Sequence, residues 1–284
     1  MPSAHQTAPP DGPPSMRRFA LRHREAVGPM RSEGGRYRSV AATLLFGAAA
    51  LGIWEAAVRV SNVPQFLLPA PSAIALRFAE AWSDGTMPRH LVPTMQEVVI
   101  GGAIGGAAGL LIGIALGLSR AARSIVSPYL VAAQSTPLLA LGPLFVIWFG
   151  PGAAAKIAIC ALISLFPIAI STLVAVRDAD PGILELYRSL GASRLQLLVE
   201  ARLPAARAGI FAGARVAATL AVVGAIVGEW LGGSVGLGVL INLARGSLFD
   251  TPLLFATLVQ IAILGVGAYA VVVVAERLSS RPSR

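Results

Sequence analysis

Side chains that could do chemistry are few in this sequence, and they are scattered. The 284 residues contain one lysine and three histidines. Lys156 follows three alanines, so the sequence lacks the Gly-x-x-x-x-Gly-Lys-Ser/Thr loop that holds nucleotide phosphates. His5, His23 and His90 lie far apart and belong to no metal-ligand or Ser/His/Asp pattern. We therefore expect no catalytic residue, no metal, no cofactor and no ATP hydrolysis by this chain itself.

Polar residues within long apolar runs form a second group of candidates. Gln134 and Ser135 precede Pro137 and share an apolar run with Pro143, and each proline removes a backbone hydrogen bond and bends a helix. Glu229 lies near the end of a later run. Polar groups in such runs usually face protein or water, because a charge in lipid is costly. We interpret Gln134, Ser135 and Glu229 as lining a solute path, although Glu229 could instead be solvated at a helix end.

The single cysteine, Cys160, lies inside another apolar run. One cysteine excludes an intramolecular disulfide and a metal cluster of cysteines. We expect a small, buried apolar side chain.

The loop at 177–207, between two apolar runs, carries the most specific local signals. Asp180 is a typical N-cap residue, and Pro181 suits the first position of a helix. Gly191 tolerates the left-handed conformation that ends a helix. The spacing therefore predicts a short helix after Asp180. Its apolar face would contain Ile183, Tyr187 and Leu190.

A second helix should follow directly. Ser193 and Gln196 have the spacing of a capping box, and Pro204 should end or bend the helix that they begin. The short first helix, with its apolar face, suits docking in a groove of another protein. It equally suits a position flat on the membrane surface. The residues alone leave both interpretations open.

The elements that must position these residues are membrane-spanning helices. Of the residues, 55% are hydrophobic and 13% are charged, against about 25% charged in typical soluble domains. A helix needs about 20 mostly apolar residues to cross a bilayer. The sequence therefore predicts an all-α polytopic membrane protein with about six transmembrane helices. The predicted spans are 40–60, 94–118, 125–149, 155–176, 208–230 and 252–274.

The basic residues give the expected topology. With six spans and the N-terminus inside, 18 of the 23 Lys and Arg residues fall on the cytoplasmic side and 5 fall outside. Positively charged loops stay cytoplasmic, so we expect a multi-pass membrane protein with both termini in the cytoplasm. This distribution also makes a nucleic-acid surface the weaker explanation of the net charge of +9.

The second predicted span carries a row of glycines at every fourth position. Such a row lets another helix approach closely. It indicates either tight packing within one subunit or a sliding surface between helices that move. The row consists of Gly101, Gly105, Gly109, Gly113 and Gly117.

The segments outside the predicted spans differ in character. Residues 1–38 are rich in Pro, Arg and Gly and predict a disordered tail. The first apolar run begins too late for a secretory signal, so we expect a retained anchor. Five prolines argue against a long helix in the external segment 61–93, although 72–82 could form a short amphipathic helix.

The order Glu185, Gly191, Leu203-Pro204 resembles the cytoplasmic signature of binding-protein-dependent ABC transporter permeases. In that family the signature starts with Glu-Ala-Ala, has a glycine after three more residues and ends in aliphatic-x-Leu-Pro. This chain has Leu186-Tyr187 where two alanines are usual, and Ala201 where a larger aliphatic residue is common. These differences concern the detail of docking.

The resemblance extends over about residues 66–276, and the stretches 143–150, 189–194 and 236–241 are similar to the nitrate, sulfonate and taurine branch. It implies the type I ABC importer permease fold, a second copy of the permease, a separate ATP-binding subunit and an external solute-binding protein. The residues implied in ATPase coupling are Asp180, Ile183, Glu185, Tyr187, Leu190, Gly191, Ala192, Leu203 and Pro204.

The implied function is that of the permease subunit of an ATP-driven importer. The branch suggests a sulfonate, taurine or nitrate as solute, but the stretch 227–232 is also similar to permeases for pyrimidine precursors. A secondary transporter or channel is the alternative, and a non-transporting scaffold is a third. The expected division is a tail at 1–38, a first helix and external segment at 39–86, an ABC type-1 permease domain at 87–276 and a tail at 277–284.

Overall fold

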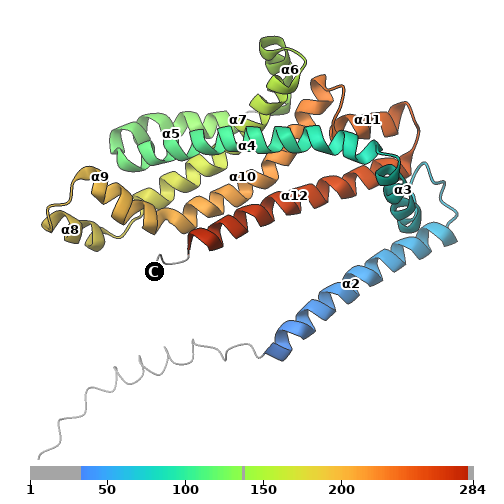
Figure 1. The fold of residues 1–284 in the computed structure, drawn as a ribbon, viewed down its shortest axis with the longest axis horizontal. Helices are drawn as coiled ribbons and strands as arrows, with labels where there is room; N and C mark the ends of the chain where they lie inside the picture. Colours follow the sequence, from blue (N-terminus) through green and yellow to red (C-terminus); the bar gives the residue numbers. More distant parts are fainter. Residues whose placement is uncertain (1–32, 136–137, 281–284) are drawn as a thin grey trace, which may run out of the picture. The chain divides into compact units, whose positions relative to one another are not determined.

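The computed structural model describes residues 33–135 and 138–280, and it describes side chains from residue 41 onward except at 131, 134, 135, 138 and 139. All regular structure in these residues is helical (Figure 1). The long helices are α2 (Glu33–Val60), α4 (Thr86–Leu118), α7 (Ala153–Arg177), α10 (Leu203–Gly232) and α12 (Thr251–Ser279). The shorter ones are α3 (Pro71–Ser83), α5 (Arg120–Ser135), α6 (Leu138–Phe149), α8 (Pro181–Ser189), α9 (Arg194–Gln196), the π-helix η1 (Leu197–Arg202) and α11 (Leu237–Gly246).

The chain divides after Ala56 into two compact units. The first unit contains most of α2, and its apolar side chains are exposed, for example Leu45 and Phe46 at 72% and 78%. A helix that is apolar all round and exposed suits contact with lipid. It begins at Glu33, within the segment predicted as a tail; the rest of that tail, residues 1–32, lies outside the described residues.

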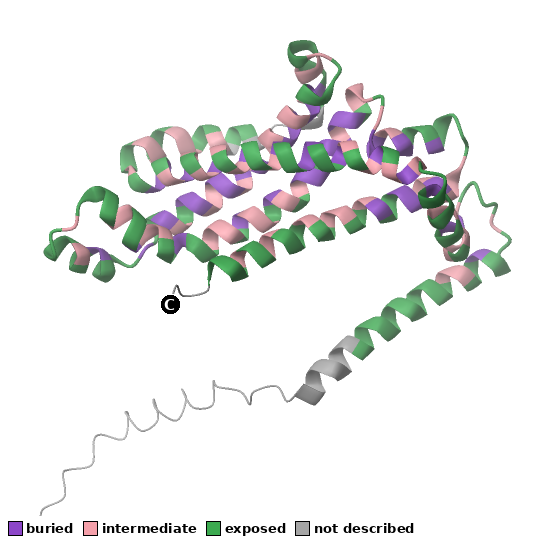
Figure 2. Ribbon diagram, viewed as in Figure 1, coloured by how far each residue is buried: buried purple, intermediate pink, exposed green. Residues whose placement is uncertain are grey.

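The core of the second unit lies where α4, α7 and α10 pack together. The most extensive contacts join α7 to α4 and to α10, and α12 packs along α10. Figure 2 shows buried residues gathered along these three helices, while much of α12 is exposed. The exposed apolar residues of α12 include Ile263, Val266 and Val271, each with more than half of its surface exposed. Such a surface is expected of a helix that faces lipid or another subunit.

Within residues 33–135 and 138–280, five helices are long and apolar enough to cross a membrane. They are Ala41–Val60, Thr86–Leu118, Ala153–Arg177, Arg194–Gly232 and Thr251–Ser279. The remaining predicted span, 125–149, is divided between α5 and the short apolar helix α6, which turns away from α5 (Figure 1). Proline disfavours the helical conformation of the residue that precedes it. Pro137 comes between α5 and α6 in the sequence, but it lies outside the described residues.

The expectation that no long helix enters the segment 61–93 is wrong. α4 begins at Thr86 and contains both Pro88 and Pro93. Pro88 lies in the first turn, where backbone N–H groups have no partner within the helix in any case. Pro93 removes one further backbone hydrogen bond of the helix. The packing of α4 on α7 offsets this loss. The predicted helix 72–82 is present as α3, with Pro71 at its first position.

The glycine row of α4 faces α7 of the same chain. All five glycines are buried. A Cβ atom built at Gly105 would overlap the Ala161 carbonyl oxygen, and one at Gly109 would lie 2.5 Å from the Leu165 carbonyl oxygen. The row therefore allows close packing within one subunit, as one of the two interpretations of the sequence held.

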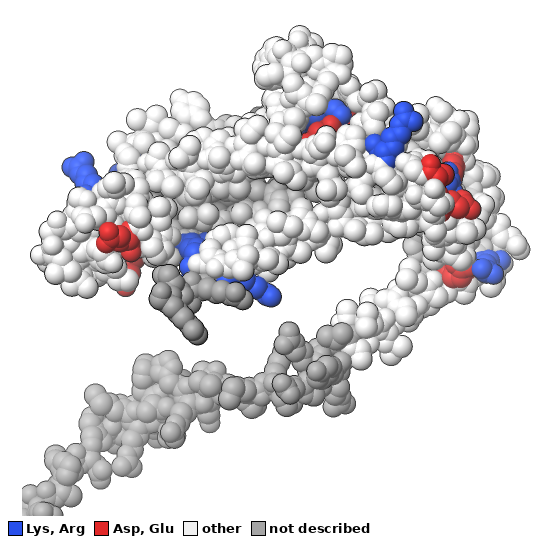
Figure 3. Space-filling view, viewed as in Figure 1, with Lys and Arg blue, Asp and Glu red and all other residues white. Residues whose placement is uncertain are grey.

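Charged side chains gather at the two ends of the second unit. Figure 3 shows Lys, Arg, Asp and Glu atoms near α8 and α12's last turn at one end, and near α3 and α11 at the other. Between them, this view shows charged atoms beneath α6 and otherwise uncharged surface. This distribution fits a protein whose middle lies in the bilayer. We refer to the two ends as the α8 end and the α11 end.

Candidate functional site

The predicted start of α8 is present at the α8 end. The Asp180 carboxylate accepts a hydrogen bond of 2.8 Å from the Gly182 N–H, and Pro181 occupies the first position. Just before it, Arg177 donates two hydrogen bonds to Asp178 at 2.6 and 2.9 Å and lowers the pKa of that carboxyl. The loop before α8 is therefore held by local polar bonds.

Gly191 ends α8 in the predicted left-handed conformation, with φ of 78°. The Gly191 N–H donates to the Arg188 carbonyl and the Ala192 N–H donates to the Tyr187 carbonyl, both at 3.0 Å. This pair of bonds is a Schellman motif. Residue 191 must therefore keep a positive φ for α8 to end where it does.

The capping box that starts the second helix is also present. The Ser193 hydroxyl accepts from the Gln196 N–H at 3.3 Å, and the Gln196 side chain accepts from the Ser193 N–H at 2.9 Å. Pro204 does not end this helix, because the chain stays helical from α9 through η1 into α10. The wider turns of η1 lie directly before Pro204. Such π-turns accommodate a residue that lacks an N–H and would crowd the carbonyl four residues earlier.

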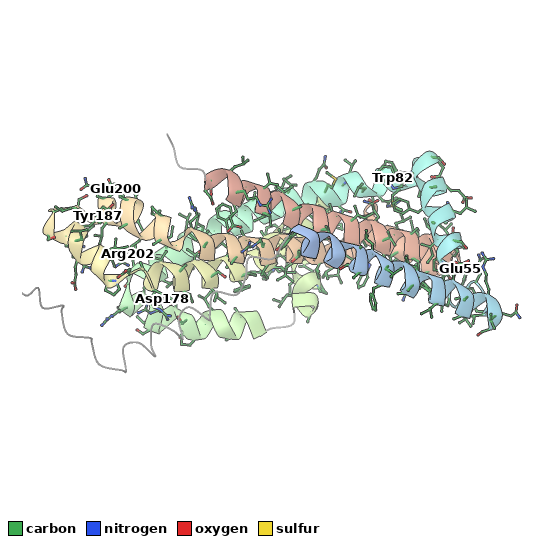
Figure 4. All side chains as sticks on the ribbon, turned by 90° about the horizontal axis from the view of Figure 1, so that it is seen from below. Glu55, Trp82, Asp178, Tyr187, Glu200 and Arg202 are labelled. Carbon is green, nitrogen blue, oxygen red and sulfur yellow. The ribbon has the colours of Figure 1, made fainter. Side chains whose placement is uncertain are left out.

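The apolar side chains of α8 divide between two faces. Leu184 is buried in a small cluster with Ala179 and Ala201, and the half-buried Tyr187 packs against that cluster. The opposite row is exposed and contains Ile183, Leu186 and Leu190 at 44%, 57% and 76%. Leu186, which lies outside the apolar face predicted from the sequence, thus belongs to the exposed row. Figure 4 shows Tyr187 at the same end as Asp178, Glu200 and Arg202.

A second group of polar side chains lies buried at the α11 end. The Glu229 carboxylate, 1% exposed, accepts a bond of 2.5 Å from Thr94 Oγ1 and another of 2.5 Å from the Gly238 N–H. Thr94 Oγ1 in turn accepts from the Leu237 N–H at 2.9 Å. Two of the first N–H groups of α11 are therefore satisfied. A carboxylate at a helix N-terminus is also favoured by the helix dipole.

Two further contacts hold the turn between α10 and α11. Lys156 forms an ion pair with Glu97 and donates to the Val235 carbonyl at 3.4 Å. The Nδ1 atom of His90 lies within hydrogen-bond distance of both the N–H and the carbonyl oxygen of Gly236. Side chains of α4 and α7 thus fix the 233–237 turn in place.

The predicted path residues are only partly described. The side chains of Gln134 and Ser135 lie outside the described residues. Glu229 is buried and bonded within the protein, so it is not solvated at a helix end. Cys160 is buried, as expected. Among the described residues no group of three His, Cys, Asp or Glu could hold a metal ion.

The sequence alone did not indicate a role in this buried group for four of its members, His90, Thr94, Glu97 and Lys156. One signal is present: His90, Thr94 and Glu97 lie at spacings of three and four residues before Gly101, which places them on the helix face of the glycine row. The prolines in that segment concealed it.

The second unit has helices that pack through small residues, a capped, exposed helix at one end and buried charges at the other. These features are compatible with a membrane transport subunit. Residues 105–284 match the family described as binding-protein-dependent transport system inner membrane component. The chain belongs to that family, and its fold is that of a type I ABC importer permease.

Several relatives are similar over most of their length. The riboflavin transport system permease protein RibX of Chloroflexus aurantiacus is 43% identical over 81% of this chain and 86% of its own. The formylaminopyrimidine transport permease ThiX of Halalkalibacterium halodurans is 33% identical over 83% and 93%. The aliphatic sulfonates permease SsuC of Escherichia coli, named as putative, is 36% identical over 76% and 81%. An inward-facing MetNI methionine ABC transporter structure has a TM-score of 0.60 and 22% identity, and covers 68% of this chain and 95% of that one.

Proposed function

We propose that this chain pairs with a second copy to form the solute path of an ATP-driven importer and binds a separate ATP-binding subunit through α8. An external solute-binding protein would deliver the solute at the α11 end. The exposed apolar row of α8 is the observation that carries the proposal. The family supports it, because a binding-protein-dependent permease works with such partners.

The docking surface is Ile183, Leu186 and Leu190. These residues lie three and four positions apart, so they form one stripe on the helix. The stripe points away from the Ala179–Leu184–Ala201 cluster that anchors α8 to the rest of the loop. A short helix fixed at both ends, with an apolar stripe outward, suits insertion in a groove. Glu185, which is exposed, would orient the helix through polar bonds.

The movement of α8 has a continuous route to the α11 end. α8 packs on η1, which continues into α10, and α10 carries Glu229 at its far end. Displacement of α8 by the ATP-binding subunit would therefore reach the turn that Glu229, Lys156 and His90 hold. We place Gln134, Ser135 and Glu229 on or beside the solute path.

The named relatives and the sequence resemblance together suggest two classes of solute. Sulfonates, taurine and nitrate are the first, and flavins and pyrimidine precursors are the second. RibX, the most identical of the three relatives described above, is named for riboflavin, and ThiX, which aligns over the largest share of this chain, is named for a formylaminopyrimidine, which favours the second class. Both classes are small and polar, and the solute-binding protein would set much of the choice.

The topology gives the first prediction. Reporter fusions after Arg284 and in the turn at Gly85 should report opposite sides of the membrane, with the C-terminus cytoplasmic, because 18 of 23 basic residues then lie inside. A fusion after Ser189 in α8 serves as a control and should agree with the C-terminal fusion. If the fusions at Gly85 and Arg284 report the same side, the topology is wrong.

The second prediction concerns the energy source. The purified permease should hydrolyse no ATP, because its sequence has no phosphate-binding loop. Reconstituted with its cognate ATP-binding subunit and solute-binding protein, it should support hydrolysis and solute uptake. Uptake that continues without the ATP-binding subunit, driven by an ion gradient, would instead establish a secondary transporter.

A further inference from the structure

An apolar cavity lies inside the second unit, between its two charged ends. Its volume is about 310 Å³, and α4, α7, α10 and α12 contribute its lining. Among the described residues that line it, Ser164 alone has a polar side chain. Val99 of α4 and Val271 of α12 also line it and are exposed at 65% and 68%, so the cavity opens between these two helices. The function proposed above assigns it no role.

The position of the cavity limits what can enter it. All four helices that line it are long and apolar enough to cross a membrane, and their lining residues belong to their middle parts. A soluble partner does not reach this depth, and a polar solute would lose its bonds to water among apolar side chains. An empty cavity would forfeit the contacts of the atoms around it. A lipid acyl chain is apolar and present at this depth, so it suits the cavity.

Two polar contacts join α10 to α12 beyond one end of the cavity. Arg215 donates a hydrogen bond of 3.0 Å to Glu276, and Arg207 donates one of 2.7 Å to the Ser279 carbonyl. On α12 the lining of the cavity extends to Val272. Glu276 is four residues further on, which is about 6 Å along a helix. Polar headgroups begin directly outside the hydrocarbon core of a bilayer, so these contacts lie at a depth that suits a headgroup.

The charges of this junction favour an anion. Glu276 neutralises Arg215, whereas Arg207 bonds to a neutral carbonyl and Arg277, in the last turn of α12, is exposed. Three arginines and one glutamate thus leave an excess of two positive charges. Figure 3 shows basic atoms beside the last turn of α12. Arginine binds phosphate strongly, and basic pockets between membrane helices on the cytoplasmic side hold anionic lipid headgroups.

We propose that the cavity and this junction bind one anionic phospholipid from the leaflet at the α8 end. One acyl chain fills the cavity, and Arg207 and Arg277 bind the phosphate. The bound lipid therefore contacts both α10, which continues from η1, and α12, and it stabilises their packing at the α8 end. The proposal does not depend on the identity of the solute or on the importer function.

The test titrates lipid onto the delipidated full-length permease in detergent and counts bound lipids by native mass spectrometry. Dioleoyl phosphatidylglycerol should bind in preference to dioleoyl phosphatidylcholine. Arg207→Gln combined with Arg277→Gln should weaken phosphatidylglycerol binding about thirtyfold, because each arginine near a lipid surface contributes about a factor of five. The matched control combines Arg188→Gln with Arg194→Gln, which removes two exposed arginines of α8 and α9 at the same end. It should keep the wild-type affinity.

A second pair of variants tests the acyl chain. Ala218 lines the cavity, so the ring of Ala218→Phe would occupy the space of the chain. This variant should weaken phosphatidylglycerol binding at least fivefold. Ala212→Phe, at an exposed position of α10 outside the lining, should leave it unchanged. If Ala218→Phe does not fold, the two lipids and the two arginine pairs still decide the question.

Four outcomes would overturn the proposal. Equal binding of the two lipids would remove the headgroup site, and equal loss in both arginine pairs would mean a general effect of surface charge. Displacement of phosphatidylglycerol by millimolar glycerol phosphate would identify a site for soluble anions. Unchanged lipid binding in Ala218→Phe would exclude an acyl chain from the cavity. If that variant also separated paired permease copies in the same spectra, the cavity would instead belong to the interface with the second copy.

Discussion

Replacing Gly191 with valine is expected to abolish most ATP-dependent uptake while the permease stays in the membrane. Residue 191 has a φ of 78°, where a residue with a Cβ atom costs about 1–2 kcal/mol. A Cβ built there would meet nothing within 4 Å, so the cost arises from the backbone and not from a clash within the chain. Loss of the Schellman motif would release the end of α8 and misdirect its apolar row. The spans that hold the protein in the membrane are untouched.

The measurement is a pair: binding of the ATP-binding subunit, and uptake by reconstituted vesicles. A cost of this size corresponds to about a tenfold loss in binding. Gly191→Asn is the matched control, because asparagine is as bulky as valine but tolerates the left-handed conformation. It should retain most of the uptake. Equal loss in both variants would indicate a clash with the partner, and wild-type behaviour in both would mean that this loop is only a connector.

The geometry of the loop at 177–207 could be predicted because its signals are local. Asp180, Pro181, Gly191 and the Ser193–Gln196 pair each act on backbone groups within three residues, so their spacing determines the caps. Which apolar side chains of α8 are buried and which are exposed was harder to predict. Whether Tyr187 or Leu186 is exposed depends on the Ala179–Leu184–Ala201 cluster, and Ala201 lies beyond the helix in η1.

The buried charges show the opposite case. Glu97 and Lys156 are 59 positions apart, and only the packing of α4 on α7 brings them together. Proline is a strong local signal against helix. In the segment before Thr94, the prolines therefore argued against a helix, although the spacing of the polar residues is helical. Tertiary packing reversed that preference and extended α4 to Thr86. Glu229 is likewise buried by tertiary packing, because the end of α10 lies against α4 and α11, and its sequence position alone also allowed a solvated helix end.

The glycine row leads to the second prediction of a large effect. Two glycine-to-alanine substitutions on α4 should change the free energy of unfolding differently. Gly105→Ala should lower the free energy of unfolding by about 1–3 kcal/mol, because overpacking a tight interface forces a backbone shift. The new methyl group would overlap the Ala161 carbonyl oxygen, a backbone atom that moves only if α4 and α7 separate. Gly102→Ala is the control, since its Cβ would lie 3.8 Å from the Ala221 Cβ, an ordinary contact.

The control should be neutral or stabilising by up to about 1 kcal/mol, because alanine favours helix over glycine. The two alanine variants should therefore shift stability in opposite directions or differ clearly in size. The single cysteine provides the measurement. Cys160 is buried on α7, where a Cβ at Gly101 would overlap its side chain, so its reaction with a thiol-reactive dye on heating reports separation of α4 from α7. Equal midpoints for Gly102→Ala and Gly105→Ala would show that the glycine row does not limit the approach of these two helices.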